Sequence, residues 1–141
     1  MKAHFSRHRI GIAAVVVVLC TAGALHALSI PFFIQGTLHD YGPLHDTVNV
    51  EIYELTLAHG ESSGWHKHPG PAFVIVGQGA LEEDHGCGSI VQRPSGSAFQ
   101  EQTGEVHNVT NRGSEVAKLF VMQIVPLNTP DYTNVNPPAC Q

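Results

Sequence analysis

Apolar residues along most of this chain occur in short runs or alternate with polar residues, which is the pattern of β-strands. Glycine, proline, asparagine and serine separate these runs, and no apolar period of a helix lies between them. The pattern predicts strands at residues 48–57, 72–76, 79–83, 89–92, 97–101, 106–110 and 117–125. Short strands at intervals of about eight to twelve residues are typical of a β-sandwich or β-barrel. We therefore expect an all-β domain.

The first predicted strand contains a change of phase. Its apolar residues occupy even positions as far as Ile52 and odd positions from Tyr53 onward. Such a shift predicts a β-bulge, or a strand that two sheets share.

The segments on either side of the predicted barrel are irregular. Residues 28–47 are interrupted by proline and glycine, which predicts an N-terminal arm with at most one short edge strand. Residues 127–141 show no periodicity and are expected to form a C-terminal coil tail.

The first 27 residues resemble an export signal. A basic head precedes an apolar run that ends in small residues, and Ala22-Gly23-Ala24 is the best cleavage site. The apolar run at 10–28 also approaches the length that spans a bilayer, so residues 1–27 are either a signal peptide or an uncleaved anchor. Both alternatives place the domain outside the cytosol, in the periplasm or secreted, and any membrane contact is through this leader.

Size and charge narrow the function. A chain of 141 residues has room for one small barrel domain. Its formal charge is −5, and removal of the leader leaves four cations against twelve carboxylates, a charge of −8. No basic surface can be assembled from this composition, which excludes nucleic acid as a partner.

The cysteines point to an oxidising compartment. Once the leader is removed, Cys87 and Cys140 are the only cysteines, and they are expected to form a disulfide that ties the tail to a hairpin tip.

The strongest candidate chemistry lies at residues 60–79. His66 and His68 are separated by one residue, and because side chains alternate along a strand, both imidazoles point to the same side. Neutral imidazole is the commonest protein metal ligand, so this strand supplies half of a coordination sphere. The best candidate for a third ligand is His107, within residues 96–111.

These two segments resemble the cupin superfamily, whose motifs read G-x5-H-x-H-x3-4-E-x6-G and G-x5-P-x-G-x2-H-x3-N. The matching positions are Gly60, His66, His68 and Gly79 in the first motif, and Gly96, Gly104, His107 and Asn111 in the second. The resemblance implies a double-stranded β-helix, or jelly-roll barrel, at residues 48–126. It also implies one divalent transition-metal ion bound by His66, His68 and His107, with Fe, Zn, Ni, Cu and Mn left open.

Two positions depart from the motifs, because Ala72 replaces the glutamate and Gln102 replaces the proline. Ala72 cannot bind a metal, so a glutamate placed there should add a ligand. In its absence, water, an anion or another side chain must fill the open positions. Gln100 and Glu101 are the nearest substitutes. If residues 102–105 form a hairpin loop, Gln100 points inward and Glu101 outward, and a β-bulge would reverse these directions.

Competing motifs explain fewer residues. The G-x-S-x-G pattern at 60–64 requires a strand-to-helix turn, and the sequence that follows cannot start a helix. The acidic run at 82–85 is interpreted as a solvated hairpin tip rather than a metal site. A copper/zinc superoxide dismutase would need more histidines than this spacing supplies.

The expected function is therefore that of an exported metal-binding cupin. It is either an oxygen-dependent oxidoreductase, with dioxygenase-like action on a small anionic or enolic compound, or a non-catalytic binding or sensing module, since the fold does not fix function. A sugar isomerase would require an acid/base pair that the sequence does not identify. The expected partners are a small molecule and, in one arrangement, a second copy in a homodimer.

Overall fold

The computed structural model describes residues 29–42 and 45–140. The predicted leader at 1–27 and its cleavage site lie outside the described residues. Within the described ranges every regular element is a β-strand, which confirms the all-β prediction. None of these residues forms a helix long and apolar enough to cross a membrane.

The strands follow the predicted order closely. They are β1 (Ser29–Tyr41), β2 (Asp46–Leu57), β3 (His66–Lys67), β4 (Ala72–Gln78), β5 (Ala80–Asp84), β6 (Ile90–Pro94), β7 (Ala98–Glu101), β8 (Asn108–Thr110), β9 (Ala117–Pro126) and β10 (Thr133–Asn134).

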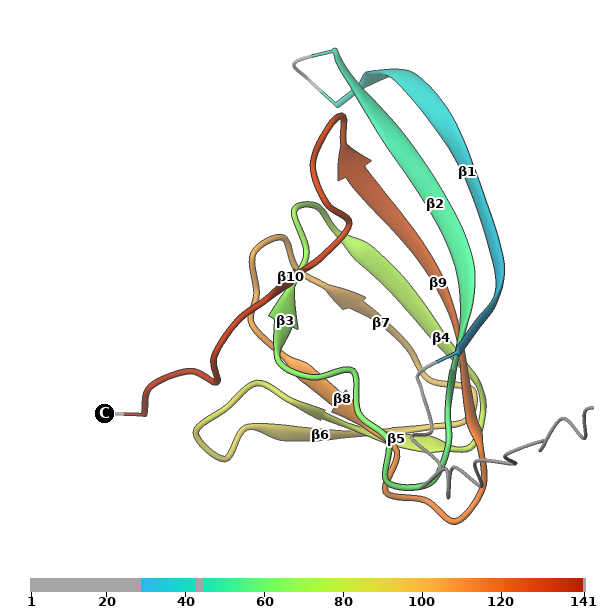
Figure 1. Cartoon of the computed structure of the whole chain (residues 1–141), viewed down its shortest axis with the longest axis vertical. Helices are drawn as coiled ribbons and strands as arrows, with labels where there is room; N and C mark the ends of the chain where they lie inside the picture. Colours follow the sequence, from blue (N-terminus) through green and yellow to red (C-terminus); the bar gives the residue numbers. More distant parts are fainter. Residues whose placement is uncertain (1–28, 43–44, 141) are drawn as a thin grey trace, which may run out of the picture.

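Two walls of antiparallel strands enclose the core (Figure 1). One wall is a five-stranded sheet in the order β1-β2-β9-β4-β7, and the other is built from the three-stranded sheet β6-β5-β8 and the pair β10-β3. This is the expected double-stranded β-helix. Alternate residues of the walls form the buried core, which consists of Leu57, Ala72, Val74, Val76, Leu81, Val109, Ala117, Leu119 and Val121.

The phase change in β2 has a different cause from the one expected. β2 pairs with β9 without interruption, from Val48 opposite Pro126 to Leu57 opposite Ala117, and both strands belong to one sheet. The predicted bulge or shared strand is therefore wrong. The inward positions become polar towards one end of the barrel, where Glu51 is buried, while Ile52 on the outer face is 38% exposed.

The N-terminal arm is more regular than predicted. β1 has 13 residues and pairs with β2 along most of its length, so the expectation of at most a short edge strand is wrong. The large apolar residues of β1 remain exposed in the structure, among them Ile30 and Phe33. The strand therefore adds an apolar edge to the sheet rather than a part of the core.

The C-terminal tail is attached at two points. The Cys87–Cys140 disulfide joins it to the β5–β6 connection, with 5.3 Å between the Cα atoms, which confirms the predicted pairing. The tail also contains β10, which pairs with β3, so the expectation of a pure coil is wrong. Its course brings it across the barrel wall that carries His66.

Asn111 of the second motif has a structural role. Its side chain is fully buried, and Nδ2 donates to the carbonyl oxygens of Leu57 (2.9 Å) and Glu115 (2.7 Å). Oδ1 accepts a hydrogen bond from the Gly113 amide at 2.9 Å. These bonds satisfy the polar groups of the turn before β9, which explains an asparagine at this position without any catalytic role.

Gly79, which closes the first motif, is required for two separate reasons. Its φ of +75° lies in the left-handed region, and a Cβ atom there would lie 2.9 Å from Ala117 Cα and 3.0 Å from Val116 O. Gly96 has a φ of +87°, but a Cβ atom added to it would meet no other atom within 4 Å, so it shares only the conformational requirement.

We predict that Gly96→Ala lowers the free energy of unfolding by about 1 kcal/mol through backbone strain alone. Gly79→Ala should cost about 2 to 4 kcal/mol, because overpacking against β9 is added to the strain. Urea denaturation of the two variants measures the difference, and equal losses would show that the contact with Ala117 relaxes freely.

Candidate metal centre

His66 and His107 are brought together by the backbone. An isolated antiparallel bridge joins them, and each amide donates to the other's carbonyl oxygen at 3.0 Å. His66 begins β3 and His107 immediately precedes β8, so a direct cross-strand pairing places their side chains as neighbours. His68 follows two residues after His66 and points the same way, as the alternation of side chains predicted.

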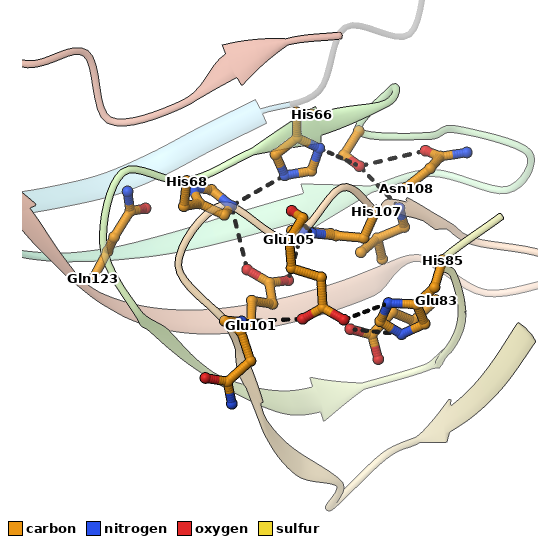
Figure 2. A network of polar contacts seen from close by, with 12 residues as sticks. His66, His68, Glu83, His85, Glu101, Glu105, His107, Asn108 and Gln123 are labelled. Atoms are coloured by element: carbon orange, nitrogen blue, oxygen red, sulfur yellow. Dashed lines mark hydrogen bonds and ion pairs between the residues drawn. The ribbon is translucent and has the colours of Figure 1, made fainter. Parts of the chain in front are cut away.

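The three imidazoles converge inside the barrel (Figure 2). Each has at most 7% of its surface exposed, and their potential ligand atoms all lie within 4.8 Å of one another. Nε2 of His66 lies 3.1 Å from Nε2 of His68. The structure therefore brings together all the residues that the sequence proposed as metal ligands, and these buried histidines could hold a metal ion.

Backbone carbonyl groups orient each ring. Nδ1 of His66 lies 2.8 Å from Gly64 O, Nδ1 of His68 lies 3.0 Å from Asp131 O, and Nδ1 of His107 lies 3.2 Å from Glu105 O. A carbonyl oxygen can only accept, so each bond places the proton on Nδ1 and leaves the Nε2 lone pair directed at the shared point. A second hydrogen bond of this kind typically supports metal-binding histidines.

Glu101 is the fourth member of the cluster. Its side chain is buried, with Oε2 lying 3.3 Å from His68 Nε2 and Oε1 lying 3.3 Å from His107 Nε2 (Figure 2). The expectation that Gln100 points inward and Glu101 outward is therefore wrong, since Gln100 is exposed.

The prediction failed because residues 102–105 do not connect a hairpin. β7 pairs with β4 in the five-stranded sheet, whereas β8 pairs with β5 in the opposite wall. The turn carries the chain from one wall to the other. The pairing of β7 with β4 therefore decides which side chains of β7 face the interior. In that register Glu101 lies opposite Ala72, the position where the family motif has its own glutamate.

In this chain the buried carboxylate thus comes from Glu101 on β7 and not from position 72 on β4, the strand beside it. Ala72 is fully buried and faces the same interior as Glu101, where its small side chain leaves room for the carboxylate. The missing glutamate of the motif was the available signal. Searching the cross-strand neighbours of position 72 would have found Glu101, but the pairing of β7 with β4 was not predicted.

The electrostatics favour the ligating forms of His66 and Glu101. Burial lowers the pKa of His66 to about 4, and positive charge on His107 and His68 acts in the same direction. Burial acts to raise the pKa of Glu101, but contacts with His107 and His68 outweigh it and lower the pKa to about 2. Burial acts to lower the pKa of His107, but the Glu101 carboxylate outweighs it and raises that pKa. At neutral pH, Glu101 is therefore ionised and His66 neutral.

The donor set fits a metal ion. Two atoms bound to one ion at about 2.0 to 2.1 Å lie about 2.8 to 3.4 Å apart at octahedral to tetrahedral coordination angles. The Nε2 separation of 3.1 Å and the oxygen–nitrogen separations of 3.3 Å fall within that range. Nε2 of His107 is also buried without a hydrogen-bond partner. With the protons on Nδ1, these atoms are all acceptors, and a cation between them removes their repulsion.

Two connected features of the interior lie beside the histidines. A cavity of about 40 Å³ is lined by His66, His68, Glu101 and core residues such as Val74 and Leu119. A larger cavity of about 160 Å³ is lined by His66 and His68 on one side and by mainly apolar residues on the other. The two share Tyr53, Leu55 and Ser63 in their linings, so a small molecule in the larger cavity would be adjacent to the histidines.

The acidic run at 82–85 is only partly solvated, so its interpretation as an exposed hairpin tip is wrong for Glu83. That side chain is 1% exposed, and its Oε2 lies 2.6 Å from Nη2 of Arg93. His85 lies between Glu83 (3.5 Å) and Glu105 (3.0 Å). The ion pair with Arg93 explains why Glu83 tolerates burial, and no metal is needed for it.

Comparison with known proteins agrees with the fold. A family model described as "Cupin domain" matches residues 53–123, half of the chain. No curated protein matches the sequence significantly.

Three solved structures share the architecture at a TM-score of 0.52. An uncharacterized double-stranded β-helix protein from Klebsiella pneumoniae is 21% identical, covering 73% of this chain and 84% of its own. Peruvianin-I, a cysteine peptidase from Thevetia peruviana latex, is 17% identical over 73% and 66%. The Schizosaccharomyces pombe Cnp3 cupin domain is 13% identical over 72% and 67%. At these identities the similarities concern the fold alone.

We predict that Glu101→Ala weakens the affinity for Zn²⁺ about 10- to 100-fold, because it removes the only anionic donor in the cluster. Titration in competition with a chelator measures the change. Gln100→Ala is the matched control, since the neighbouring side chain is exposed and should leave the affinity within about twofold of the original. Equal losses in both variants would remove Glu101 from the donor set.

The position of this carboxylate can also be tested in reverse. In the Glu101→Ala background, Ala72→Glu should restore much of the affinity, because it returns a carboxylate from the opposing strand position. In the unaltered protein, Ala72→Glu should not tighten binding, because it places a second buried carboxylate beside the first. This revises the expectation from sequence, which assumed that no carboxylate was present.

Proposed function

The chain belongs to the cupin superfamily, and from this membership and its cluster of buried donors we propose that it binds one divalent transition metal and oxidises a small molecule with dioxygen. The observation that carries the proposal is the convergence of His66, His68, His107 and Glu101 beside a cavity of about 160 Å³. The three histidines and one carboxylate would hold the ion.

A redox-active ion in this position would supply electron transfer between dioxygen and a bound substrate. The chain itself contributes three things to that chemistry. The backbone carbonyls of Gly64, Asp131 and Glu105 fix the imidazole tautomers, and apolar side chains line much of the small cavity at the site. Glu101 lowers the positive charge of the site by one unit.

The charge balance favours an anionic substrate group. One carboxylate and three neutral imidazoles leave a single positive charge from a divalent ion, which an alkoxide, enolate, carboxylate or thiolate would neutralise. The cavity beside His66 and His68 gives such a group room to approach. Tyr53 is not a base for this reaction, because burial raises the pKa of its hydroxyl, which donates to Gln123 Oε1 at 3.2 Å.

We predict oxygen consumption by the protein loaded with Fe²⁺, Mn²⁺ or Cu²⁺ when it is presented with an enolic, catecholic or thiol substrate. His107→Ala should abolish it together with metal binding, whereas His45→Ala, an exposed histidine of the β1–β2 turn, should change neither. Metal content and an oxygen electrode give the two readouts. Binding of metal and ligand without oxygen uptake would establish the alternative, a non-catalytic binding or sensing module.

We also propose that the domain is exported. The Cys87–Cys140 disulfide supports this, because such bonds persist mainly in oxidising compartments. The basic and apolar leader supports it independently. Mass spectrometry of the protein from the extracytosolic fraction should show loss of the residues up to Ala24. An intact leader on membranes would establish an anchor, and a mainly cytosolic protein with free thiols would contradict export.

A further inference from the structure

We propose that the N-terminal arm and the C-terminal tail form a ligand pocket beside the three histidines. The pocket fits a single-ring or similarly compact molecule that carries one anionic group, its head. This rests on the proposed function for the head group, which would face the metal, but the pocket itself is defined by apolar walls that need no metal. The walls come from Ile30 and Phe33 of the arm, Tyr53 and Leu55 of β2, and Tyr132 of the tail.

Most of these walls lie outside the region that defines the family. The family match spans residues 53–123, whereas Ile30, Phe33, Asp131 and Tyr132 lie before or after it. The three histidines therefore lie within the family match, and much of the part of the pocket that would contact the body of a ligand comes from the segments that flank it.

The proposed pocket explains why apolar residues at its opening are exposed. Ile30, Phe33 and Tyr132 are each about half exposed, at 51%, 50% and 48%, although they come from distant parts of the sequence. Exposed apolar residues that gather around a concavity are typical of a ligand-binding rim. The ring of Phe33 stacks on Tyr53 at 6.4 Å, and the ring of Tyr132 meets His66 edge-on at 6.1 Å.

The size of the cavity limits the ligand. Its volume is about 160 Å³, and an apolar protein cavity of roughly 150 Å³ holds one benzene molecule. A single ring therefore fills this volume, and the second ring of a fused bicyclic molecule would extend past the half-exposed rim. The polar lining consists of His66, His68, Ser63 and Asp131, and the backbone carbonyl of Asp131 bonds to His68. An anionic head would therefore face the histidines and the metal that they hold.

The tail is held so that it can act as a wall. Asp131 O accepts hydrogen bonds from His68 Nδ1 and from the Gln123 amide, and the Val135 amide donates to Trp65 O at 3.0 Å. β10 pairs with β3 at His66 and Lys67, and the disulfide at Cys140 holds the end of the tail to the β5–β6 connection. Tyr132 is thus fixed between two anchors, and the same segment orients the ligand His68.

The first test compares two carboxylates on the full mature protein loaded with Co²⁺, whose visible spectrum reports ligands of the metal. Benzoate and acetate share a head group and differ by the ring, so benzoate should bind about tenfold more tightly. 2-Naphthoate should bind no more tightly than benzoate, because its second ring extends beyond the cavity. Equal affinities for benzoate and acetate would overturn the pocket.

Substitutions then locate the ring. Tyr132→Ala should weaken benzoate binding about five- to tenfold and leave acetate unchanged. Phe120→Ala is the control, because this aromatic residue is 47% exposed on the outer face of β9 and should affect neither anion. A Tyr132→Ala variant that weakens both anions equally, or neither, would show that the tail does not form the wall.

The pocket can also be tested without metal, which separates its failure from that of the proposed function. Toluene added to the metal-free protein should shift the NMR signals of the Ile30 and Leu55 methyl groups and of the Tyr132 ring. If these signals do not move, the pocket is refuted even where the metal binds. If they move but Co²⁺ does not bind, the proposed function fails and the pocket stands.

Removing the disulfide tests whether the pocket needs an anchored tail. In the Cys87→Ala/Cys140→Ala variant, the Val135 amide should lose hydrogen-exchange protection and the affinity for benzoate should fall towards that for acetate. Retention of the full benzoate preference with an unprotected tail would overturn the tail's part in the pocket.

Discussion

The most demanding feature of this structure is the burial of four polar side chains whose unshared electron pairs point at one another. Burying an imidazole or a carboxylate without a partner costs several kcal/mol. Here the outward-facing nitrogens of His66, His68 and His107 are satisfied by backbone carbonyls, while the inward-facing atoms lie close together at 3.1 to 3.3 Å. The contacts of Glu101 with His68 and His107 offset part of this cost, and a bound cation is the simplest partner that satisfies all of these atoms at once.

Several features of the surrounding fold hold the histidines and Glu101 in place. The bridge between His66 and His107 fixes two rings through the backbone, and the fully buried Asn111 secures the turn that follows β8. Glu51 and Gln123 continue the polar character of the inner wall, where burial, aided by the charge of Asp131, raises the pKa of Glu51. The apolar core occupies the other end of the barrel, so one closed architecture provides both a stable interior and a polar site.

The sequence was informative wherever a local rule decided the outcome. Alternation of side chains placed His66 and His68 on one face, and the spacing of apolar runs located the strands of both walls. It failed wherever the outcome depended on which strands pair. The direction of Glu101 follows from the pairing of β7 with β4, and no pattern within residues 98–105 encodes that choice. The phase change in β2 was misinterpreted for a related reason. Inward-facing polar residues near the site change the alternation of apolar residues in the same way as a β-bulge would.

The arm and the tail show why a family match leaves the ligand undetermined. The region shared with the family supplies the scaffold and the histidines, which can serve many reactions. The residues that would contact the body of a ligand lie in β1 and around β10, where composition alone predicted little structure. Both segments are ordered by pairing onto the barrel, and the tail is further ordered by a covalent bond. In the proposed pocket, the barrel would supply the metal donors, whereas β1 and the tail around β10 would supply the contacts that select the ligand.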